Sequence, residues 1–147
     1  MTVKDDLLKL KIAAAAVTST DAGWTTLTRD STTGKIVVQI DKCPMGGIPI
    51  EVIAAADTGT STNKTMLVTI EASDELASEW ITVATFPSIT YATTTAVRFV
   101  RRVATQLKYL RSVITVAGDN GTISRIFEIH VGIGLVDDDA GYVGSGT

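Results

Sequence analysis

The sequence predicts an all-β protein, and three observations lead to this fold class. From Ile36 onwards, apolar residues alternate with polar ones in short runs that are separated by turn-forming residues. Threonine is frequent, the chain has 12 glycines, and long runs of helix-forming residues are absent after residue 16. About seven such runs without helical crossovers favour antiparallel sheets, and a second sheet is needed to cover the apolar face of the first. We therefore expect an antiparallel, jelly-roll-like β-sandwich, with a small β-barrel as the alternative.

The chain divides into three predicted parts. Its 147 residues are enough for one domain with its own core. Residues 1–35 start with a stretch that has room for about two or three helical turns. They continue as a polar, turn-rich segment without a periodic apolar face. We expect an extended N-terminal arm here, which packs on the body or on a neighbouring chain. Residues 36–134 form the predicted β-sandwich domain, and residues 135–147 a flexible, acidic and Gly-rich tail.

The first half of the domain predicts three strands, at residues 36–41, 50–56 and 65–73. In each of them apolar side chains recur at every second position, which places them on one face of a strand. Two prolines and two adjacent glycines in residues 43–49 separate the first strand from the second. The polar residues 57–64 predict a loop before the third strand.

The next segment predicts two more strands, at residues 80–86 and 96–103. Before them, residues 73–79 have a serine closely followed by a glutamate, which permits a single helical turn. In the second of these strands the alternation places Arg101 on the same face as Phe99.

Residues 108–134 predict a β-hairpin. Asn120-Gly121 is the dipeptide that a type I′ turn prefers, because both central residues of that turn have positive φ. A turn at this position would bring Ile114 opposite Phe127, so that the apolar faces of the two strands coincide.

His130, the one histidine in the sequence, lies in this hairpin. The predicted register gives it polar or exposed neighbours, and no second histidine or cysteine stands near it to help hold a metal. We therefore expect a solvated or interface histidine. Its predicted neighbours on the same side of the hairpin are Arg111, Thr115, Ile126 and Glu128.

Charge and composition argue against several classes of partner. The formal net charge is −3, which provides no overall field to gather nucleic acid or an anionic membrane. No apolar run approaches the ~20 residues of a membrane span, and residues 12–17 are too short and too close to Asp5 and Asp6 for a signal peptide. Cys43 is the single cysteine, so an intrachain disulfide is excluded, and we expect it to act as a small apolar side chain.

Motifs that carry chemistry are missing from the sequence. No GxSxG pattern accompanies His130, and the glycine-containing stretches lack the spacing of phosphate-binding loops. The aspartates of residues 137–139 lack the spaced ligands of an EF-hand loop and predict a solvated acidic tail. We therefore expect no enzyme activity and no catalytic, metal-binding or cofactor-binding residues.

A basic cluster is the most distinctive charge feature. It lies within fourteen residues of a mildly acidic chain. One interpretation is a patch that docks on an acidic protein surface or on phosphates, and the other is protection of an edge strand against sheet-to-sheet pairing. Arg101, on a mainly apolar face, favours the interface. The candidate interface residues are Arg98, Arg101, Arg102, Lys108 and Arg111.

The order of motifs also carries a resemblance to a known family. A Gly-rich break precedes LVTIEASDELASEWITVATF, which is followed by RFVRRV and then by LKYLRSVITVAGDNGTISRIFEIHVGIG. In these segments Ser73-Asp74 leads to Trp80 before the next strand, and a strand with Tyr109-Leu110-Arg111 leads through a Gly-containing turn to the last strand. This order, over residues 36–134, resembles the capsid cement (decoration) proteins of tailed, podovirus-type bacteriophages. The longer loop at residues 57–64 and the acidic tail depart from the family pattern.

The resemblance implies a non-enzymatic virion protein. Such a protein is made in the host cytoplasm, binds the outer surface of the icosahedral head as a homodimer or homotrimer, and clamps neighbouring subunits of the major capsid protein. It has no cofactor, and neither a membrane nor a nucleic acid is its principal partner. The alternative is a phage tail, head-fibre or adhesin module that binds glycans of the host surface.

Overall fold

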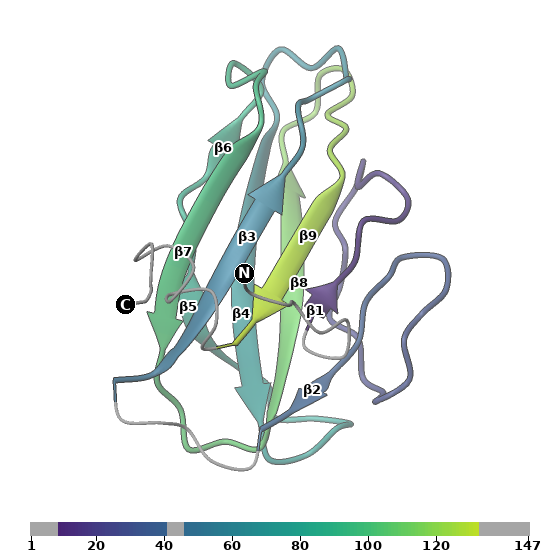
Figure 1. The fold of residues 1–147 in the computed structure, drawn as a ribbon. Coiled ribbons are helices and arrows are strands. Elements are labelled where there is room, and N and C mark those ends of the chain that lie inside the picture. Colours follow the sequence, from purple (N-terminus) through teal and green to yellow (C-terminus); the bar gives the residue numbers. More distant parts are fainter. Residues whose placement is uncertain (1–8, 41–45, 133–147) are drawn as a thin grey trace.

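The computed structural model describes residues 9–40 and 46–132, and the regular structure of these residues consists of strands (Figure 1). The predicted all-β fold with antiparallel sheets is confirmed for this part of the chain. The strands are β1 (Lys9–Lys11), β2 (Val38–Gln39), β3 (Ile48–Ala54), β4 (Thr65–Ser73), β5 (Ile81–Thr85), β6 (Ile89–Thr90), β7 (Val97–Val103), β8 (Tyr109–Ala117) and β9 (Phe127–Val131).

The strands form two antiparallel sheets that lie one behind the other in Figure 1. The first sheet has the order β1-β9-β3-β7, and the second has the order β2-β8-β4-β5, with the short β6 paired to β4. The longest pairing joins β4 to β8 over nine residues of each strand. Strand β7 is therefore an edge of the first sheet, and β5 is an edge of the second.

The core lies between the sheets and comes from every second residue of the strands. Ile50 and Val52 of β3 have no exposed surface, and Met66 and Ile70 of β4 are equally buried. Burial of such a side chain contributes roughly 1.5–3 kcal/mol relative to an exposed one. The period-two pattern of the sequence thus identified the inward side chains of these strands.

The predicted hairpin of residues 108–134 is wrong, because β8 and β9 belong to different sheets. Strand β8 pairs with β2 and β4, while β9 pairs with β1 and β3. Gly121 has a positive φ of 77° but Asn120 does not, so a type I′ turn is not formed. Ile114 and Phe127 both point into the core. The alternation of apolar and polar residues predicts which face of each strand is buried, but it carries no information about which strands pair.

Two connections cross from one sheet to the other at the same end of the molecule. One joins β3 to β4, the other joins β8 to β9, and they lie side by side at the top of Figure 1. Backbone hydrogen bonds tie them together, from Thr60 N to Thr122 O at 2.6 Å and from Thr58 N to Ser124 O at 3.0 Å. These bonds satisfy backbone N–H and C=O groups of the two connections. In a hairpin, such groups would instead have been paired between its two strands.

The described part of the predicted arm packs on its own body. Strand β1 pairs with β9, and further on Val17 pairs with Arg125 and Asp21 with Ile114 of β8. Leu10 is fully buried and Val17 is 6% exposed, so this segment adds side chains to the core. It covers the side of the sandwich between β9 and β8. Residues 1–8, Cys43 and the predicted tail at 135–147 lie outside the described residues.

The helical turn permitted at residues 73–79 is not formed. The backbone makes bends there, held by the Ser73 hydroxyl, which accepts a hydrogen bond from Glu75 N at 3.0 Å and donates one to Ser78 O at 2.8 Å. Within residues 9–40 and 46–132 there is no helix with the length and apolar character that a membrane crossing requires.

Candidate functional site

The five predicted interface residues do not come together in one patch. Arg98, Arg101 and Arg102 lie on the edge strand β7 of the first sheet. Lys108 precedes β8 and Arg111 lies within it, in the interior of the second sheet. The basic cluster of the sequence is therefore divided between two surfaces.

The three arginines of β7 form what we call the arginine edge. Arg98 Nε makes an ion pair with Glu51, whose side chain is buried on the adjacent strand β3. Arg101 Nη1 donates to Thr85 O of β5 at 2.6 Å, which links the edges of the two sheets. Arg102 Nη1 donates to Gly47 O at 3.0 Å. All three residues are exposed in the described chain.

The packing of apolar residues of β7 explains why the three arginine side chains point to solvent. Val103 is 1% exposed, and Phe99 packs on Phe86 at a ring-centroid distance of 6.4 Å. The apolar residues anchor the strand, and the arginines occupy positions where the sheet ends. The predicted placement of Arg101 on the face of Phe99 agrees with this alternation, and its guanidinium extends beyond that face to β5.

Arg111 belongs to a separate polar and aromatic site on the outer face of the second sheet. Its Nε donates to Glu71 Oε1 at 2.7 Å, and its guanidinium carbon lies 4.2 Å from the centre of the Trp80 ring. Nη1 donates to Trp24 O at 3.4 Å. The guanidinium occupies the space that a side chain at Gly23 would need. No spacing or motif in the sequence indicates that Trp24 and Trp80 lie together, and the fold places both beside Arg111.

Lys108 contributes to neither of these surfaces through a salt bridge in the described chain. Its ammonium lies 5.5 Å from the centre of the Tyr109 ring, a cation–π distance. Its backbone N–H donates to Asp74 Oδ1 at 3.1 Å.

His130 has Glu128 beside it as the sequence predicted, but not the predicted neighbours on β8. It lies in β9 between Glu51 of β3 and Lys9 of β1, away from Arg111 and Thr115, because β9 pairs with those strands and not with β8. Its side chain is 4% exposed, so it is not solvated, and Nε2 lies 3.0 Å from Glu128 Oε1. No group of three or more metal-ligating side chains occurs in residues 9–40 and 46–132.

Arg125 is a buried residue that sequence reasoning missed. Its side chain has no exposed surface, and its guanidinium donates to Ala55 O at 2.8 Å, to Thr95 O at 3.0 Å and to Thr93 O. Burial lowers the pKa of Arg125, and attraction to Asp57 partly opposes this. The residue thus fastens the connection before β7 to the end of β3. No pattern in the sequence around Arg125 indicates this role.

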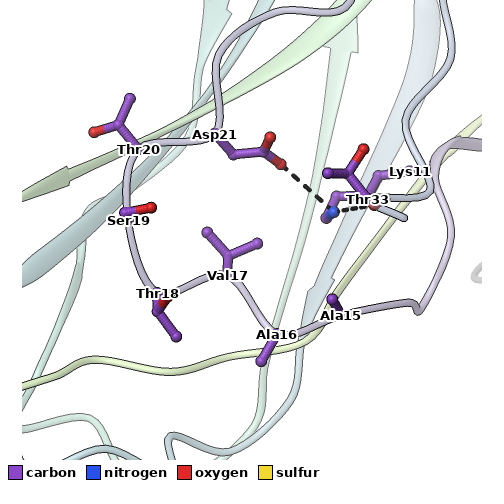
Figure 2. Close-up of a pocket in the computed structure, with 9 residues that line it drawn as sticks. All are labelled: Lys11, Ala15, Ala16, Val17, Thr18, Ser19, Thr20, Asp21 and Thr33. Carbon is purple, nitrogen blue, oxygen red and sulfur yellow. Dashed lines mark hydrogen bonds and ion pairs between the residues drawn. The ribbon is translucent and has the colours of Figure 1, made fainter. Parts of the chain in front are cut away.

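A pocket of about 220 Å³ lies under the N-terminal segment (Figure 2). The loop of residues 15–21 curves around it, and Lys11 and Thr33 face it from the opposite side. Lys11 Nζ donates to Thr33 O and lies 3.5 Å from Asp21 Oδ2. The pocket was not predicted, because residues 1–35 were expected to form an arm without a buried face.

Asp21 is shared between two lysines. Besides Lys11 it pairs with Lys35, whose ammonium also donates to Ala22 O at 2.7 Å and lies 5.7 Å from the centre of the Trp24 ring. Burial lowers the pKa of Lys11, and the attraction of Asp21 only partly offsets it.

No protein-family model matches the chain, and no curated protein matches it either.

Proposed function

We propose that this protein is a bacteriophage capsid cement protein. It binds the outer surface of the icosahedral head, stabilises contacts between neighbouring major capsid subunits, and acts without catalysis or a cofactor. It is made in the host cytoplasm and works in the virion as a homodimer or homotrimer. The observation that supports this function best is the arginine edge, an exposed row of cations on an edge strand.

The charges of Arg101 and Arg102 are available to a partner. In the described chain their hydrogen bonds reach only carbonyl oxygens, at Thr85, Gly46 and Gly47. A carbonyl accepts a hydrogen bond but does not neutralise a guanidinium, so a carboxylate on a capsid subunit would add a charge-assisted bond. Consecutive strand residues point to opposite faces of the sheet, so the two arginines reach both sides of the edge.

The β-sandwich that carries these arginines is suited to holding capsid subunits together. Two packed sheets with a dry core resist deformation, because a packed interior transmits strain instead of yielding to it. A decoration protein occurs in many copies on a head, so that modest contacts by each copy add up through multivalency. The sandwich, with its N-terminal segment packed along one side, supplies the rigid unit that this role requires.

The test is co-sedimentation of purified protein with expanded heads of the phage that encodes it, followed by heating. We expect binding at about 1 µM protein, weakening with added salt, and a higher temperature of head disruption. The charge-reversed variant Arg101→Glu with Arg102→Glu is expected to bind roughly tenfold or more weakly. Lys64→Glu with Lys108→Glu makes the same change in net charge away from β7 and serves as the matched control. Absence of binding by the unmodified protein would reject the proposal.

A second candidate function has support from the Arg111 site. A tail, head-fibre or adhesin module binds host glycans through exposed aromatic rings with nearby polar groups, and Trp80, Arg111 and Glu71 lie together on an outer sheet face. If this is the function, a glycan array shows binding that is lost in Trp80→Ala and kept in Tyr91→Ala, an exposed aromatic elsewhere. An array without binding removes this candidate.

A further inference from the structure

Asn120 and Gly121 lie in the connection between β8 and β9, one of the two connections that lie side by side at the top of Figure 1. Both residues are exposed. They do not form the tight hairpin turn that this dipeptide favours. The dipeptide also has chemistry of its own, because the side-chain amide of an asparagine lies within reach of the next backbone nitrogen. When the next residue is glycine, no side chain hinders the approach of the two groups.

The two groups that would react make no hydrogen bond within the described residues. The Gly121 N–H donates to no acceptor there, and the side-chain amide of Asn120 neither donates nor accepts. The fold holds Asn120 through its backbone: its N–H donates to Asn63 Oδ1 at 2.9 Å, and its C=O accepts from Thr62 N at 3.4 Å. The Asn120 side chain is therefore free to turn towards the Gly121 nitrogen.

The packing of the two connections requires a glycine at position 121. Its φ is 77°, and an added Cβ would lie 2.7 Å from Thr60 O and 2.7 Å from Ser61 Cα. A residue with a side chain, which would hinder attack by its own nitrogen, therefore does not fit here unless the connections separate. The fold thus keeps an unhindered nitrogen next to Asn120.

We propose that Asn120 is a modification site that deamidates without an enzyme. The Gly121 nitrogen loses its proton and attacks Cγ of Asn120. A C–N bond forms to Cγ, the bond from Cγ to the side-chain nitrogen breaks, and this nitrogen leaves as ammonia after taking up a proton from water. Water then opens the resulting succinimide ring at one of its two carbonyl carbons, which gives either aspartate or isoaspartate. This chemistry requires no step of the capsid proposal and is tested on the isolated protein.

Asn63 provides a comparison within the same molecule, because the sequence has two asparagines and this one is also exposed. Its side chain is engaged: Nδ2 donates to Asp119 Oδ1 at 2.8 Å, and Oδ1 accepts from Asn120 N. The nitrogen that would attack it is engaged as well, since Lys64 N donates to Ser61 Oγ at 2.8 Å. The loss of two or three such bonds before the reaction slows it by roughly tenfold or more.

The isoaspartate product is expected to loosen the contact between the two connections. Its main chain runs through the former side-chain carbon and is longer by one atom at position 120. Two residues further on, Thr122 O accepts hydrogen bonds from Thr60 N at 2.6 Å and from Ser61 N at 2.8 Å. The longer chain displaces Thr122 O from these donors. The aspartate product keeps the length of the main chain and therefore keeps both bonds.

The test is peptide mapping by mass spectrometry while the full chain is incubated in mildly alkaline buffer. A synthetic peptide of residues 115–125 shows the time in which the unrestrained dipeptide converts. Asn120 is expected to convert roughly tenfold or more faster than Asn63, and at a rate that increases with pH, because the Gly121 nitrogen must lose its proton. Full retention of Asn120 after the peptide has converted, or equal conversion of the two asparagines, would overturn the proposal.

Two variants separate the modification from its structural effect. Asn120→Ser removes the reacting amide and keeps the backbone N–H and C=O that hold the connection, so it is expected to fold and to stay unmodified. Asn120→Asp reproduces the aspartate product. Amide hydrogen exchange at Thr60 and Ser61 is expected to be roughly tenfold or more faster in the purified isoaspartate form and unchanged in Asn120→Asp. Equal protection of these amides in the isoaspartate form and the unmodified protein would contradict the loosening.

Discussion

At the scale of single residues, Arg125 shows how one buried cation holds several segments together. Its three carbonyl partners come from residues 55, 93 and 95, which belong to two separate connections. Replacement by methionine keeps much of the packing volume and removes every donor. The free energy of unfolding is expected to fall by about 3 kcal/mol, because three charge-assisted bonds are lost.

Urea unfolding of Arg125→Met beside Arg102→Met measures this difference. Arg102 is exposed and donates to the carbonyls of Gly46 and Gly47, so its replacement is expected to cost less than about 1 kcal/mol. Equal losses in the two variants would show that burial of Arg125 has no energetic consequence.

The lowered pKa of Lys11 predicts how the free energy of unfolding changes with pH. Burial lowers its pKa from the ordinary value of 10.5, and the nearby Asp21 raises it only in part. Between the lowered pKa and 10.5, the unfolded chain holds more protons at this group than the folded chain does. The contribution of Lys11 to the free energy of unfolding therefore increases as pH rises through this window.

Lys11→Met has no titrating group at this position. As pH rises towards 10.5, the ordinary pKa, the stability of the unmodified protein relative to this variant is expected to rise, as measured by urea unfolding at several pH values. A difference that stays constant over the range would contradict the lowered pKa.

The charged residues show which roles can be predicted from the sequence and which cannot. Arg98, Arg101 and Arg102 were identified because their alternation along one strand is visible in the sequence, and they do lie on one strand. Arg111 was grouped with them by closeness in the chain, although the fold carries it into another sheet. Arg125 and Lys11 owe their roles to segments that are distant in sequence, and no local pattern reports such contacts.

At the scale of elements, the two crossing connections depend on close backbone approach at Gly59. A Cβ there would lie 2.7 Å from the carbonyl carbon of Thr122 and collide with its oxygen. Gly59→Ala is expected to lower the free energy of unfolding by roughly 2 kcal/mol or more, because the loops must separate and lose their mutual hydrogen bonds.

Gly46→Ala is the matched control for this change. Gly46 has a positive φ of 90°, but no atom of the described residues lies within 4 Å of an added Cβ, so only backbone strain of about 1 kcal/mol is expected. Chemical denaturation of both variants provides the comparison. A Gly59→Ala protein as stable as Gly46→Ala would show that the two connections are not closely packed.

Strand positions were predictable, and strand partners were not. The segments predicted at residues 65–73 and 96–103 match β4 (Thr65–Ser73) and β7 (Val97–Val103) closely. Their side chains alternate between core and solvent, a property of each strand alone. The pairing of β8 with β4 and of β9 with β3 depends on connections that cross between sheets, and Asn120-Gly121 suggested a tight hairpin that the chain does not make.

At the scale of the whole molecule, the protein is a packed two-sheet body with different chemistry on its separate surfaces. The arginine edge lies on β7, the Arg111 site lies on the outer face of the second sheet, and the pocket lies under the N-terminal segment. Because these surfaces are distinct, substitutions on β7 are expected to alter capsid binding, and Lys11→Met is expected to leave it unchanged.

We propose that the sandwich binds the outside of the head through its arginine edge. Cryo-electron microscopy of expanded heads incubated with the purified protein tests it most directly. We expect additional density on the outer surface, at boundaries between major capsid subunits, into which the two-sheet body fits with β7 towards the shell. Heads without added density, or density that contacts the shell only through surfaces other than β7, would contradict it.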